Sequence, residues 1–90
     1  MTEHEYCFKM VEKKVLDIVR DAINLLITSQ PEMFLAQVEE AFAILPFWAT
    51  ELDAEERQSI MVASIKMLVD RGSDLEPIAD DLCRIYEKFA

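Results

Sequence analysis

Glycine and histidine each occur once in this chain of 90 residues. A single glycine excludes a glycine-rich loop that cradles phosphate groups, because such loops need several positions without a side chain. A single histidine, His4, excludes the di-iron bundle pattern, which needs two Glu-x-x-His motifs. His4 also lies in a terminal turn that we expect to fray, where it is poorly placed for nucleophilic catalysis. We therefore expect no enzyme, no catalytic residues, no metal site and no cofactor.

Cysteines and long apolar runs are also scarce. The two cysteines, Cys7 and Cys83, are fewer than a small secreted disulfide scaffold usually carries, so we expect reduced thiols. The sequence leaves open a disulfide between the first and last helices. The longest nearly apolar stretches, 42–49 and 60–69, are shorter than the roughly 20 residues that a membrane helix needs. The N-terminal residues also lack the features of a signal peptide. We expect a soluble, cytoplasmic protein without a membrane partner.

Basic residues are outnumbered by acidic ones, with 9 Lys and Arg against 18 Asp and Glu and a net charge of −9. A protein that binds nucleic acid by neutralising phosphates needs the opposite balance. Lys9, Lys13 and Lys14 do cluster, but acidic residues interleave with them, so pairing within one helix is their expected role. We therefore expect no direct contact with nucleic acid.

Apolar residues recur at spacings of three and four along the chain, which is the periodicity of amphipathic helices. Neither a period-two alternation nor an Asn-Gly or Asp-Gly turn indicates a strand. The sequence predicts helices at roughly 4–28, 31–46, 53–71 and 76–89. Short connections make successive helices antiparallel neighbours. The predicted fold is all-α, with a single domain over residues 1–90: a compact antiparallel four-helix bundle built from two αα-hairpins.

Polar residues stand where the helices are expected to begin. Asp53 or Thr50 is placed to cap the third helix. A Ser followed three residues later by Glu is the capping-box pattern. This pattern precedes the second and fourth helices, at Ser29–Glu32 and Ser73–Glu76.

Proline and glycine mark the expected helix ends. Pro46 disfavours helical geometry at the residue before it, so the second helix should end or kink there. Gly72 follows the third helix and can adopt the left-handed conformation of a C-terminal cap. Pro77 allows the fourth helix to begin as late as Glu76.

The negative charge is concentrated in the middle of the chain. No Lys or Arg occurs between Arg20 and Arg57, and this stretch also contains half of the eight aromatic residues. The rest of the chain holds ten acids and nine bases, so it is nearly neutral. The eight acids of the base-free stretch are Asp21, Glu32, Glu39, Glu40, Glu51, Asp53, Glu55 and Glu56.

Two interpretations of this stretch compete. In the first, the aromatics fill the core and the acids form a solvated face that maintains solubility. In the second, Phe47 and Trp48 leave the helical stripe after Pro46 and form an apolar patch with an acidic rim, which suits a basic or amphipathic partner. We take the second for the region as a whole. The predicted partner-binding residues are Glu39, Glu40, Phe47, Trp48, Glu51 and Asp53.

The sequence thus predicts a non-catalytic protein–protein interaction module, such as a small cytosolic regulator, an adaptor or a chaperone-like subunit. Its partner is a basic or amphipathic protein, or a second copy in a homodimer, because the third helix is apolar nearly all round. One alternative is an acidic inhibitor, of the type that mobile elements encode, which blocks the nucleic-acid-binding site of a basic protein. A small helical enzyme or metal protein is a second, disfavoured alternative.

Overall fold

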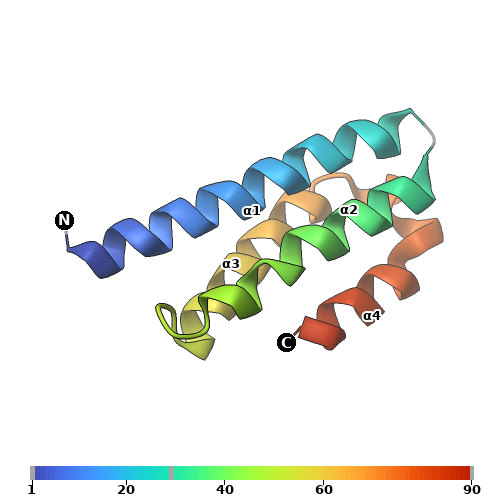
Figure 1. Ribbon diagram of the computed structural model, residues 1–90. Helices are drawn as coiled ribbons and strands as arrows, with labels where there is room; N and C mark the ends of the chain where they lie inside the picture. The colour runs from blue at the N-terminus through green and yellow to red at the C-terminus, as the bar shows by residue number, and fades with distance from the viewer. Residues whose placement is uncertain (1, 29, 90) are drawn as a thin grey trace.

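The structure, a computed structural model, describes residues 2–28 and 30–89 (Figure 1). Over these residues it is helical without any strand, and no helix among them is long and apolar enough to cross a membrane. The predicted all-α bundle is therefore confirmed. Its elements in chain order are α1 (Glu3–Ile27), α2 (Pro31–Ala43), the 3₁₀ helix η1 (Leu45–Trp48), α3 (Ala54–Val69), the 3₁₀ helices η2 (Gly72–Asp74) and η3 (Glu76–Ile78), and α4 (Ala79–Phe89).

The helix α1 agrees with its predicted bounds within one residue at each end. It begins after Thr2, whose Oγ1 accepts a hydrogen bond from the backbone N–H of Glu5 at 3.1 Å. This cap satisfies one of the unpaired N–H groups at the helix start. The acidic residues of the first turn interact favourably with the positive end of the helix dipole. Its buried residues follow the predicted apolar spacing: Val11, Val15, Val19 and Ala22.

The helix α2 is shorter than predicted. It begins at Pro31 after Gln30, which makes no side-chain capping bond, and the capping box predicted from Ser29 lies outside the described residues. It ends at Ala43, so its predicted extension to Pro46 is wrong. Proline lacks a backbone N–H and its ring crowds the carbonyl four residues earlier, so the chain tightens there into the separate 3₁₀ helix η1.

The helix α3 has the predicted cap. Asp53, rather than Thr50, is the N-cap: its Oδ1 accepts the Glu56 N–H at 2.8 Å, and Glu56 Oε1 accepts the Asp53 N–H at 3.2 Å. These reciprocal bonds form a capping box. The helix ends at Val69, before its predicted end. Gly72 then adopts the predicted left-handed conformation, with φ of 51°.

The start of α4 corrects the sequence prediction. The helix begins at Ala79 rather than Glu76, and the chain before it forms η2 and η3. Neither 3₁₀ helix has a side-chain cap, so the capping box predicted for Ser73 and Glu76 is wrong. Pro77 lies in the first turn of η3, where its fixed φ suits a tight turn and its missing N–H costs no hydrogen bond.

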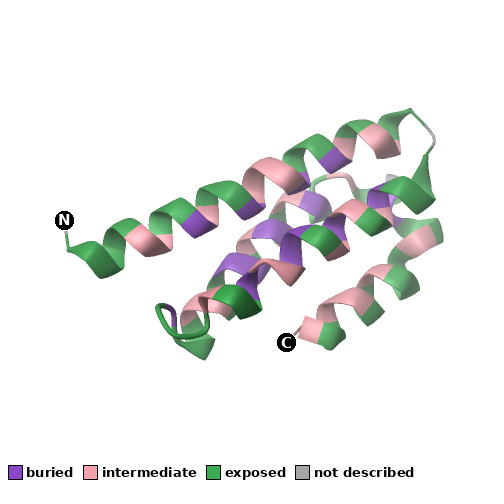
Figure 2. Ribbon diagram, in the orientation of Figure 1, coloured by how far each residue is buried: buried purple, intermediate pink, exposed green. Residues whose placement is uncertain are grey.

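The core belongs mainly to the first three α-helices, as the purple segments of Figure 2 show. The helix α1 packs most extensively against α2 and also against α3, whereas α4 packs mainly against α2. No residue of α4 is fully buried. Its inward-facing Leu82, Ile85, Tyr86 and Phe89 are half-buried against the core, and the Phe89 ring meets Phe42 edge to face at 6.5 Å. The hairpin formed by α3 and α4 is therefore less closely packed than the hairpin formed by α1 and α2.

Two side-chain hydrogen bonds involve buried or partly buried polar groups, one between two helices and one within a helix. The Gln37 side chain of α2 donates to the backbone carbonyl of Ile18 in α1 at 3.2 Å. Ser64 is fully buried in α3, and its hydroxyl donates to the carbonyl of Ile60 at 3.0 Å. A buried hydroxyl needs such a partner, because an unpaired one costs about 1–3 kcal/mol.

The two cysteines do not form the disulfide that the sequence left open. Cys7, in α1, is half-buried and Cys83, in α4, is exposed, and both are free thiols.

Candidate partner-binding surfaces

The predicted partner-binding residues lie at the end of α2, in η1 and in the loop that leads to α3, a region that we call the corner (Figure 1). The two neighbouring aromatic residues of the corner differ in their exposure. Phe47 is 85% exposed, whereas Trp48 is half-buried and packs against the core. Leu52 is buried, and its N–H donates to the Trp48 carbonyl at 2.8 Å. Trp48 and Leu52 thus anchor the loop while Phe47 projects from it.

Two of the predicted acids already bind a neighbouring helix of the chain. Glu39 is half-buried in α2 and forms an ion pair with Lys88 of α4. Asp53 caps α3. Glu40 and Glu51 are exposed, and the Glu51 carboxylate accepts a hydrogen bond from the Thr50 hydroxyl at 2.7 Å. The part of the predicted set that is open to a partner is therefore Phe47 with Glu40 and Glu51.

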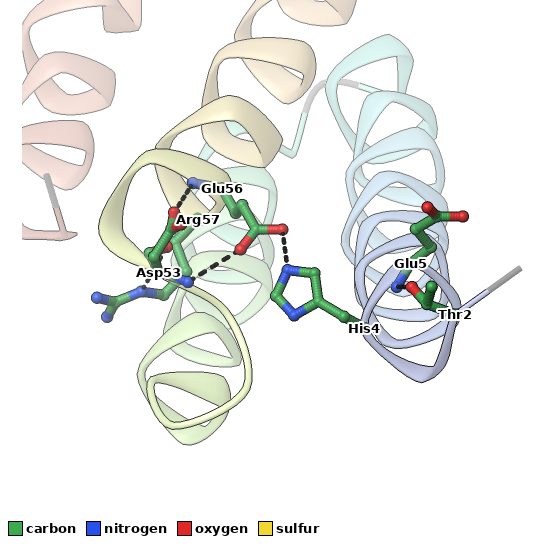
Figure 3. Close-up of polar contacts among 6 residues, drawn as sticks. All are labelled: Thr2, His4, Glu5, Asp53, Glu56 and Arg57. Atoms are coloured by element: carbon green, nitrogen blue, oxygen red, sulfur yellow. Dashed lines mark hydrogen bonds and ion pairs between the residues drawn. The ribbon is translucent and has the colours of Figure 1, made fainter.

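A third acid, Glu56, links the start of α3 to the start of α1 (Figure 3). Its Oε1 belongs to the capping box, and its Oε2 lies 2.7 Å from Nε2 of His4. Arg57 reaches back to the carbonyl of Asp53, with Nε 3.4 Å from the oxygen. His4 therefore belongs to a capped helix with a tertiary contact, whereas the sequence suggested a frayed turn.

Two acids of the base-free stretch have partners from outside it. Lys88 from the last helix reaches Glu39, and His4 from the first helix reaches Glu56. Asp53 is committed to the cap of α3. The acids therefore do not form one continuous free surface. Within the part of the chain that the structure describes, no group of three or more His, Cys, Asp or Glu residues could hold a metal ion.

The bases of α1 behave as expected for pairing within a helix. Lys13 lies 3.5 Å from Asp17, and Arg20 lies 2.9 Å from the same carboxylate. Lys13 and Arg20 are exposed and Asp17 is half-exposed, so each pair contributes only a few tenths of a kcal/mol, on the order of 0.3–0.5.

A second candidate surface is a groove of about 380 Å³ between α3 and α4, which sequence reasoning missed. Its lining is almost entirely apolar, and Val69 within it is 65% exposed. Val62, 39% exposed, lies on the same stripe of α3 at helical spacing. The groove arises because α4 packs mainly against α2 and leaves its α3 side uncovered. Its main lining residues are Ile65, Val69, Leu75, Leu82, Cys83 and Tyr86.

The groove could have been found from one signal in the sequence. The buried residues Ile60, Ser64 and Leu68 form one stripe of α3. Val62 and Val69 lie outside that stripe, so a second apolar face was already present. In the sequence, this all-round apolarity indicated a homodimer and did not identify the face that α4 covers only partly.

Comparison of the chain with protein-family models, with curated proteins and with solved structures found no match.

Proposed function

We propose that this protein is a non-catalytic protein-interaction module that binds its partner through the corner. The observation that carries the proposal is the 85% exposure of Phe47 on a short 3₁₀ helix. Removing a Phe side chain from water on binding favours association by about 1.5–3 kcal/mol. Because Trp48 and Leu52 hold the loop against the core, Phe47 is presented on a fixed backbone, which lowers the entropy lost on binding.

Charge supports a basic or amphipathic protein as the partner. Glu40 and Glu51 are exposed carboxylates of the corner that do not cap a helix, and the whole chain carries a net charge of −9. A negative field speeds encounter with a positive surface and disfavours acidic competitors. A small regulator, adaptor or chaperone-like subunit fits these properties. The two free thiols support a location in the reducing cytoplasm.

The test is capture of partners from an extract of the native host, using the full chain as bait, followed by mass spectrometry. Phe47→Ala should lose the partner, because truncating an aromatic anchor costs about 2 kcal/mol or more, roughly a thirtyfold loss of affinity. Met33→Ala is the matched control, since Met33 is an apolar residue of 56% exposure at the other end of α2. Equal capture of the partner by both variants would show that the corner is not the binding surface.

A second pair of variants tests the charge. Glu40→Lys should weaken capture, whereas Glu32→Lys, in the first turn of α2, makes the same change in net charge away from the corner. If both weaken capture equally, the overall charge of the protein is responsible rather than the corner.

The acidic-inhibitor alternative needs a row of exposed carboxylates that stands in for a nucleic-acid backbone. Glu39, Asp53 and Glu56 instead bind groups of the chain itself, so that alternative is not the function that we propose.

A further inference from the structure

The groove between α3 and α4 is a second surface, separate from the corner. Val69 at its α3 side is 65% exposed, and no side chain of α4 is fully buried. Between α3 and α4, the Gln58 side-chain amide donates a long hydrogen bond of 3.5 Å to the Tyr86 hydroxyl. The groove between α3 and α4 therefore leaves apolar side chains exposed to water, and a further apolar element would cover them.

Both bases of α4 are engaged by acids. Arg84 lies 3.2 Å from Asp81, and Lys88 pairs with Glu39 of α2. None of these four residues lines the groove, whereas Glu87 does. Arg84 is three residues from Glu87 and four from Asp80, but it is paired with Asp81 and with neither of those two acids.

The acids at this edge have no partner of their own. The side chains of Glu87 and the exposed Asp80 make no hydrogen bond or ion pair with any described residue. The α3 edge carries one exposed base, Lys66, and one exposed acid, Asp70, so its charges offset each other. The α4 edge is therefore the negative one, and an occupant with basic residues along that edge would be complementary to it.

We propose that the α3–α4 groove binds an amphipathic helix of a partner protein, with apolar side chains seated between Val69 and Tyr86 and basic side chains along Asp80 and Glu87. The α4 edge from Ala79 to Glu87 is about 12 Å long, roughly two helical turns. A helix of this length offers apolar anchors at spacings i, i+4 and i+7.

A second copy of the chain is the less favourable occupant. A two-fold symmetric contact sets the α4 edge of one protomer against either the α4 edge or the α3 edge of the other. In the first case Asp80 and Glu87 approach the same acids of the other copy, and like charges brought together at an interface oppose association. In the second case the charges of Lys66 and Asp70 offset each other, so the α3 edge offers no net positive charge.

The experiment measures fluorescence anisotropy of a labelled synthetic helix of about 18 residues, with Leu at i, i+4 and i+7 and Lys at the positions that flank this apolar face. The full chain should bind it with a dissociation constant in the micromolar range, on the order of 1–50 µM. A peptide of the same composition with its leucines scattered should bind at least about tenfold more weakly, because it has no apolar face.

Matched variants locate the binding. Val69→Lys should weaken it about tenfold or more, whereas Met33→Lys, a similar change at another exposed apolar residue, should leave it within about twofold. Glu87→Lys should weaken it more than Glu32→Lys does. Because Val69 and Glu87 are both exposed, none of these changes disturbs the core, and circular dichroism checks that each variant is folded.

Three results would overturn the proposal. The first is the absence of binding by the full chain at about 100 µM peptide. The second is equal binding by the Val69→Lys and Met33→Lys variants. The third is a concentration-dependent dimer in sedimentation that Val69→Lys dissociates, which would make a second copy the occupant. Phe47→Ala should leave peptide binding unchanged, so failure of this proposal and failure of the corner proposal are distinguishable.

Discussion

The capping box at the start of α3 allows a quantitative prediction. Asp53→Ala removes the acceptor that receives the Glu56 N–H at 2.8 Å and also removes a negative charge at a helix N-terminus. Loss of an N-cap lowers the free energy of unfolding by about 1 kcal/mol, within a range of roughly 0.5–2. For a domain of this size, about 1 kcal/mol corresponds to a fall in Tm of roughly 4–8 °C.

Asp53→Asn separates the hydrogen bond from the charge. Asn keeps a side-chain oxygen and is as good an N-cap as Asp, so only the interaction of the charge with the helix dipole, about 0.3–1 kcal/mol, is lost. Thermal unfolding followed by circular dichroism, and by the fluorescence of the single Trp48, should therefore give the order wild type, Asn variant, Ala variant. Equal Tm values for the Ala and Asn variants would refute the capping argument.

Thr50→Ala is the control for that series. Thr50 is exposed, and its hydroxyl binds only the neighbouring Glu51 carboxylate among the described contacts, at 2.7 Å. Its substitution should change the free energy of unfolding by no more than about 0.5 kcal/mol.

Three further predictions concern stability. Ser64→Ala should leave stability unchanged or raise it by about 0.5 kcal/mol in urea unfolding, since its hydroxyl binds a carbonyl of its own helix and Ala is the better helix former. A loss above about 1 kcal/mol would contradict this reasoning. Gly72→Ala should cost about 1 kcal/mol although a Cβ there meets nothing within 4 Å, because φ is +51°, and Gly72→Asn should cost less. A reducing agent should leave Tm unchanged, because Cys7 and Cys83 are free; a lower Tm would indicate a disulfide.

Local signals in the sequence predicted the structure correctly where a few adjacent residues determine the backbone conformation. Asp53 was predicted as one of two candidate caps, and the left-handed Gly72 was predicted outright, because capping and positive φ depend on residue types at fixed short spacings. The start of α4 was predicted wrongly, because Ser73 and Glu76 have the same spacing as a true capping box. There the chain follows two 3₁₀ turns instead.

The surfaces could be predicted only in part, because exposure depends on which helices meet. The sequence identified Phe47 and Trp48 as a pair, but only the packing shows that one projects and the other anchors. Glu39 looked free because its partner, Lys88, is 49 residues away in the chain. The groove beside Val69 depends on α4 packing mainly against α2, which helical periodicity does not encode.

Photo-crosslinking tests the central claim, that Phe47 is the side chain that meets the partner, most directly. A benzoylphenylalanine residue is placed at position 47 or, as the control, at position 33, and the protein is irradiated in an extract of the native host. Met33 is also exposed, so both probes are accessible before binding. A covalent adduct with one protein partner from position 47, and none from position 33, is the predicted result. An adduct from position 33 alone, or none from position 47, would contradict the account.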